Sequence, residues 1–74
     1  MYFVLAYHRG RHELIERHTY TAAEHEQAWA QRNQLTIKHA GEADVEVVLL
    51  GADSESELLR THGRYFERVA PTLP

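Results

Sequence analysis

The fold is decided by the segment Tyr2-Phe3-Val4-Leu5-Ala6-Tyr7-His8, residues 2–8. Successive side chains of a strand point to opposite faces of a sheet, and here both alternating sets are apolar. A strand that is apolar on both faces must be covered on both, which is typical of the centre of a sheet. We therefore predict that residues 2–8 form a central strand.

A second strand follows after the short connection Arg9-Gly10-Arg11. Residues 13–20 are half polar, which indicates an edge strand in a hairpin with the first. The length of the connection sets the register, and the sequence leaves it open by one residue. A slip of one residue would exchange the two faces of the second strand.

A helix is predicted next, over residues 21–40. Thr21 and Glu24 have the spacing of a capping box at its start, and Gly41 favours a left-handed cap at its end. Trp29 is the largest apolar side chain in this segment. We expect it to anchor the helix on the sheet.

A third strand and a second helix complete the pattern. Residues 45–50 are β-branched and nearly all apolar, and Gly51 ends them. Ser54 and Glu57 have capping-box spacing at the start of a second helix, which Pro71 closes. The side chains expected to form the core under the helices are Trp29, Leu58, Leu59 and Phe66.

These elements predict an α+β fold of the order ββαβα. The sheet is three-stranded and antiparallel, with strand order 2-1-3, and is packed with two helices that cover one face. The alternative left open is that the second helix covers the opposite face. Residues 1–70 are predicted to form a single domain and residues 71–74 a C-terminal tail.

Composition narrows the class of protein. A chain of 74 residues buries only ~60–65% of its unfolded surface. The absence of cysteine excludes disulfides, thiolate metal sites and cysteine nucleophiles, which leaves self-association as a way to complete the core. No apolar run is long enough for a membrane helix and the N-terminus lacks a signal-peptide pattern, so we expect a cytoplasmic protein. The preponderance of arginine over lysine indicates a high-GC bacterium or its phage.

Charge argues against nucleic acid as a partner. The net charge is −3, and no segment forms a strongly basic face. Residues 42–59 contain six acidic residues and no basic one, which predicts a solvated acidic rim.

Histidine is the residue type that could carry chemistry, with six copies in the chain. His8 and His12 flank the hairpin turn, but two ligands are too few for zinc. His62 lies on the apolar stripe of the second helix, where a core position is expected. We predict no metal site, no cofactor and no catalytic residue, and an enzyme is not the favoured class.

The favoured function is a protein-interaction module, accessory or regulatory, that acts as a homodimer. If both helices lie on one face, the other face shows an apolar patch of the kind that marks an interface. The predicted interface residues are Tyr2, Val4, Ala6, Val48 and Leu50. Dimerisation is expected through this face or through an edge extension of the sheet. The alternatives are a phage- or plasmid-type regulator or antitoxin that binds and inhibits a host protein, and a small histidine-dependent hydrolase or nuclease.

Overall fold

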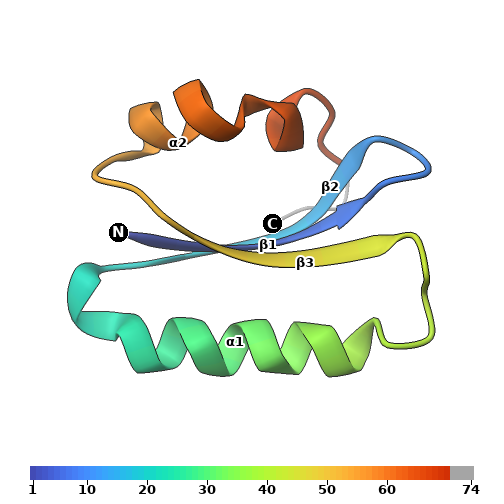
Figure 1. Cartoon of the computed structure of the whole chain (residues 1–74), viewed down its shortest axis with the longest axis horizontal. Coiled ribbons are helices and arrows are strands. Elements are labelled where there is room, and N and C mark those ends of the chain that lie inside the picture. The colour runs from blue at the N-terminus through green and yellow to red at the C-terminus, as the bar shows by residue number, and fades with distance from the viewer. Residues whose placement is uncertain (71–74) are drawn as a thin grey trace.

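The computed structural model, which describes residues 1–70, places one layer of helix on each side of a sheet (Figure 1). The elements are β1 (Tyr2–His8), β2 (Glu13–Tyr20), a 3-10 turn (Ala22–Glu24), α1 (His25–Lys38), β3 (Val45–Gly51), α2 (Glu55–His62) and a second 3-10 turn (Gly63–Phe66). This order and the strand order β2-β1-β3 confirm the predicted α+β fold. The predicted tail, residues 71–74, lies outside the described residues. No helix within residues 1–70 is long and apolar enough to cross a membrane.

The central strand is β1, as its two apolar faces predict. Phe3, Val4, Leu5 and Ala6 are each 0% exposed, and β1 pairs antiparallel with both neighbours. A bulge interrupts the β1–β2 ladder between Ala6 and Tyr7. Because a bulge inserts an extra residue in one strand, side chains of β2 change face relative to β1 at this point.

The two helices lie on opposite faces of the sheet (Figure 1). Ala28 and Leu35 of α1 cover the face that carries Val4 and Ala6. The predicted covering of a single face is therefore wrong, and the alternative holds. Leu58 of α2 and Tyr65 of the following turn cover the opposite face.

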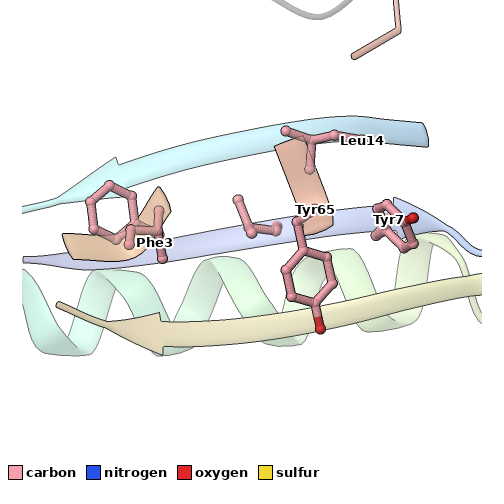
Figure 2. Close-up of a cluster of buried hydrophobic side chains, with 6 residues drawn as sticks. Phe3, Tyr7, Leu14 and Tyr65 are labelled. Atoms are coloured by element: carbon pink, nitrogen blue, oxygen red, sulfur yellow. The ribbon is translucent and has the colours of Figure 1, made fainter. Parts of the chain in front are cut away.

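The α2 side of the sheet carries the larger aromatic cluster. Figure 2 shows Phe3 and Tyr7 of β1, Leu14 of β2 and Tyr65, which belong to one cluster of buried side chains. The rings of Tyr7 and Tyr65 meet edge to face at 5.1 Å, a favoured geometry for aromatic pairs. The bulge in β2 is what turns Leu14 to this face, opposite Tyr7.

The predicted core is correct at Leu58 and wrong at two other positions. Leu58 is fully buried and Phe66 is partly buried, but Trp29 is 43% exposed and Leu59 45% exposed. On α1 the small side chain of Ala28 faces the sheet, so the bulky Trp29 lies at the side of the helix. After His62 the chain tightens to a 3-10 turn, whose shorter period brings Tyr65 into the core.

The helix starts follow the predicted capping, but the end of α1 does not. Glu24 accepts the Thr21 N–H at 2.8 Å, and the Ser54 hydroxyl accepts the Glu57 N–H at 3.2 Å. The prediction of a left-handed cap at Gly41 is wrong, because no glycine among the described residues has positive φ. The C-cap is His39, with φ of −103°.

Candidate functional site

The structure divides the five predicted interface residues between the two faces of the sheet. Val4 and Ala6 are 0% exposed beneath α1, with Tyr2 half-buried beside them. Val48 and Leu50 lie on the other face, packed against the cluster that contains Phe3 and Leu5. The placement of all five on one face is wrong, because β3 pairs with β1 in the register Phe3↔Leu50 and Leu5↔Val48. Directly opposite residues share a face.

The surplus of apolar surface lies instead on β3, at the edge of the sheet. Every residue from Val45 to Leu50 is half-buried, although five of these six are apolar. Among the described residues β3 pairs only with β1, so its other side has no partner strand. An apolar edge strand of this length is a template for pairing with another chain.

The hydrogen bonds between β1 and β3 show which residues of β3 direct their backbone N–H and C=O groups away from β1. Met1 and Ala52 exchange two hydrogen bonds, of 2.9 and 3.0 Å. In an antiparallel ladder such pairs recur at every second residue, so the even-numbered residues of β3 bond to β1. The residues that direct both N–H and C=O to the open edge are Val47, Leu49 and Gly51.

The open edge of β3 is flanked by one side of α1. Arg32, Thr36 and Ala40 project from this side and, with Val45 and Val47 of β3, line a cavity of about 310 Å³. The spacing of the three helix residues, four apart, places them on one stripe of the helix. The cavity therefore opens beside the unpaired strand.

Trp29 stands on the same stripe of α1, one turn before Arg32. Its indole N–H donates to His25 Nε2 at 2.9 Å, and the Arg32 guanidinium lies 5.9 Å from its ring. His25 in turn packs against Tyr2 at 5.0 Å between ring centroids. A half-exposed tryptophan held by its neighbours is a typical interface anchor. We name the open edge of β3 together with this stripe (His25, Trp29, Arg32, Thr36 and Ala40) the β3 flank.

The other edge of the sheet is less open. Leu14 of β2 donates its N–H to Arg68 at 2.8 Å and accepts from Ala70 at 2.9 Å, so the C-terminal segment covers the start of β2. Further along, β2 carries Glu16, Arg17 and His18. Charged side chains on an edge strand discourage pairing with a second chain.

A network of charged and polar side chains fixes the end of α1 to β2. Glu16 Oε1 lies 3.0 Å from His18 Nε2, and its Oε2 lies 3.2 Å from Lys38 Nζ and 3.6 Å from His39 Nε2. The His39 side chain is only 10% exposed, and its Nδ1 lies 3.0 Å from Glu42. Burial raises the pKa of Glu16, but the contacts with His18 and Lys38 outweigh this, so its pKa lies below the usual value.

The histidines at the hairpin form a turn instead of a ligand pair. His8 is opposite Glu13 in the ladder, so His12 lies within the connection, with φ of 53°. His8 Nδ1 accepts the N–H of Arg11 at 3.1 Å, which stabilises the turn. Within residues 1–70, no group of three or more histidine, aspartate or glutamate side chains is arranged to hold a metal ion.

Arginines neutralise much of the predicted acidic rim. Glu46 pairs with Arg64 at 3.8 Å and Glu57 with Arg60 at 2.6 Å. The Tyr65 hydroxyl donates to Glu46 at 3.0 Å, and burial together with this carboxylate raises the pKa of Tyr65. Since Glu46 is the one charged residue of β3, this pairing lowers the electrostatic obstacle to burial of the strand.

The sequence interpretation did not locate the β3 flank, although it named an edge extension of the sheet as a second route to the dimer. The signal that could have found it is the presence of two doubly apolar strands in a sheet with only one central position. Trp29 was assigned to the core for its size alone. No known family model, curated protein or solved structure matches this chain.

Proposed function

We propose that this chain is a non-enzymatic protein-interaction module that acts as a homodimer, formed by antiparallel pairing of β3 with β3 of a second copy. The observation that carries the proposal is the open edge of β3, where apolar side chains on both faces accompany outward N–H and C=O groups. Pairing would join the two three-stranded sheets into one six-stranded sheet. The two α1 helices would lie on one face of this sheet and the two α2 helices on the other.

The alternation of inward and outward backbone groups along β3 restricts the registers in which two copies can pair. Outward backbone groups belong to odd-numbered residues, so hydrogen-bonded partners across the interface must both be odd-numbered. A two-fold axis at Val48 meets this condition and pairs the whole strand Val45–Gly51 with itself. In this register Glu46 faces Leu50 of the second copy, so the two copies of Glu46 do not oppose each other. Because β3 can pair with itself over its whole length, a second copy of this chain is favoured as the partner over a strand of another protein.

The energetic balance requires contacts beyond the strand. The N–H of Val45 is already donated to Glu42 at 3.1 Å, so the register adds roughly six hydrogen bonds across the interface. At ~0.5–1.5 kcal/mol each they supply about 3–9 kcal/mol, against an association cost of roughly 4–15 kcal/mol. Burial of side chains on the β3 flank must supply the remainder.

The proposal is tested by blocking one outward N–H without altering a side chain. A chain of 74 residues is within reach of chemical synthesis, which allows N-methylation of Leu49. The methyl group removes a donor at the open edge and obstructs a second strand, while the β1–β3 bonds remain. The matched control is N-methylation of Glu55, the first residue of α2, whose N–H needs no partner within the helix.

We expect sedimentation to give a dimeric mass for the unmodified chain and for the Glu55 control at micromolar concentration. The Leu49 variant should be monomeric with an unchanged circular dichroism spectrum. A monomeric unmodified chain at these concentrations would refute the homodimer. A dimeric Leu49 variant would show that the copies associate through another surface.

A further inference from the structure

We infer that Trp29 of each copy fills the cavity beside β3 of the other copy, so that the two tryptophans lock the dimer reciprocally. This inference rests on the proposed β3 pairing. It adds the side chain that inserts and the cavity that accepts it, which together would make the pairing specific. A single chain carries both parts on one flank: a half-exposed indole, and a cavity of about 310 Å³ between α1 and β3.

The positions of Trp29 and the cavity can be compared along the direction of β3. His25 packs on Tyr2, and Tyr2 is paired with Gly51, so the start of α1 is level with the end of β3. Measured from there, Trp29 lies ~6 Å along α1 at 1.5 Å per residue. Leu49 lies ~7 Å along β3 at 3.3 Å per residue, so it is level with Trp29.

On the same scale, the cavity lies one to two turns further along the helix than Trp29. Arg32 lies ~10 Å and Thr36 ~16 Å from the start of α1. Val47 lies ~13 Å along β3, between these two levels. All three residues line the cavity.

With a two-fold axis at Val48, Leu49 of the second copy lies opposite Val47 of the first. Trp29 of the second copy therefore arrives beside Val47, between Arg32 and Thr36, at the mouth of the cavity. The axis at Val48 is the one that pairs the whole of β3 with itself, and the same axis brings the indole to the level of the cavity.

The lateral spacing leaves room for a large side chain. Strands lie ~4.8 Å apart, so the two β1 strands of the dimer, and the helices above them, are separated by roughly 14 Å. Directly packed helices lie 8–10 Å apart, so two α1 helices need bulky groups between them. The Arg32 guanidinium, already 5.9 Å from its own Trp29 ring, lies next to the position of the incoming indole and can stack on it.

Trp29 is the only tryptophan in the chain, so it reports its own environment. Intrinsic fluorescence is recorded across the concentration range in which sedimentation follows monomer and dimer. We expect a shift of emission to shorter wavelength and loss of acrylamide quenching as the dimer forms. The N-methyl-Leu49 chain should keep the emission of a half-exposed tryptophan at every concentration.

Two substitutions test the contact from each side. Trp29→Ala removes the indole and Thr36→Phe fills the mouth of the cavity, and each should raise the dimer Kd by on the order of 100-fold, as loss of an interface anchor does. The control is Ile37→Ala, which removes an apolar side chain that is 77% exposed on the outer side of α1 and should leave the Kd unchanged. Circular dichroism of each monomer checks that the fold is retained.

The outcomes separate this inference from the proposed function. Absence of a dimer refutes both. A dimer in which Trp29 stays accessible to acrylamide, and which tolerates Trp29→Ala and Thr36→Phe, refutes the reciprocal insertion and leaves β3 pairing in place.

Discussion

Leu58 and Leu59 are adjacent residues of α2 with the same side chain and opposite environments. Leu58 is 0% exposed and packs in the cluster with Phe3 and Tyr65, whereas Leu59 is 45% exposed. Replacing each by alanine changes the same atoms in the same helix. The difference between the two variants therefore measures how α2 lies on the sheet.

The magnitudes follow from burial. Leu58→Ala removes a fully packed side chain and leaves a cavity, which costs ~2–5 kcal/mol. Leu59→Ala removes about three methylene equivalents worth ~0.8 kcal/mol each, of which only about half are buried, so the loss is roughly 1 kcal/mol. A domain of this size has a stability of ~4–11 kcal/mol, so the first change removes a large part of it.

Thermal unfolding followed by circular dichroism gives the comparison, at one fixed chain concentration because the proposed dimerisation would stabilise the folded state. At ~4–8 °C per kcal/mol, Leu58→Ala should lower Tm by at least ~8 °C and Leu59→Ala by less than about 8 °C. Equal losses, or a larger loss for Leu59→Ala, would refute the orientation of α2.

Two further predictions concern the charged network and the end of α2. The folded-state pKa of Glu16 lies below its usual value of 4.5, so the stability it contributes is present above that pH and is lost as the pH falls through the lowered pKa. The difference in Tm between the unchanged chain and Glu16→Gln should therefore shrink with acidification below about pH 4.5, whereas a constant difference would contradict the pKa direction. Gly63 has a right-handed conformation (φ of −57°), and an added Cβ would meet no atom within 4 Å, so Gly63→Ala should stabilise the chain by ~0.4–1 kcal/mol. A fall in Tm for Gly63→Ala would show that the glycine is needed for its conformation.

The strand order could be predicted from the sequence because it depends on one local property. Residues 2–8 are apolar at every position before His8, which favours cover on both faces and a central position, and β1 is the central strand. The helix starts were predictable for the same reason, because Thr21 with Glu24 and Ser54 with Glu57 act within one turn.

The sequence could not predict which face of the sheet each side chain of β2 and β3 occupies. That assignment depends on the register between strands that are far apart in sequence. The pairing of Val48 with Leu5 assigns each residue of β3 to a face, and a shift by one residue would reverse the assignment. The bulge between Ala6 and Tyr7 likewise determines which face each side chain of β2 occupies, and nothing in residues 13–20 marks its position.

The position of Trp29 depends on how closely α1 approaches the sheet. Ala28 packs with Leu35 against Val4 and Ala6, and the small side chain of Ala28 lets the helix lie close to the sheet, where an indole would not fit. Size alone favoured Trp29 as the anchor, but the available space decided otherwise. Its exposure is a consequence of packing between segments far apart in sequence.

Covering both faces of the sheet moves the place where a second chain can bind from a face to an edge. A three-stranded sheet has one central strand, yet both β1 and β3 are apolar on both faces. With α1 and α2 on opposite sides, the faces of β1 are satisfied within one chain. Only a fourth strand would give β3 the neighbours that β1 already has, and its outward N–H and C=O groups supply the bonds. A second copy offers a strand of the same length and the same apolar pattern. The surplus of apolar side chains, from which the sequence predicted a dimer through a bare face or through an edge extension of the sheet, therefore favours pairing at the edge.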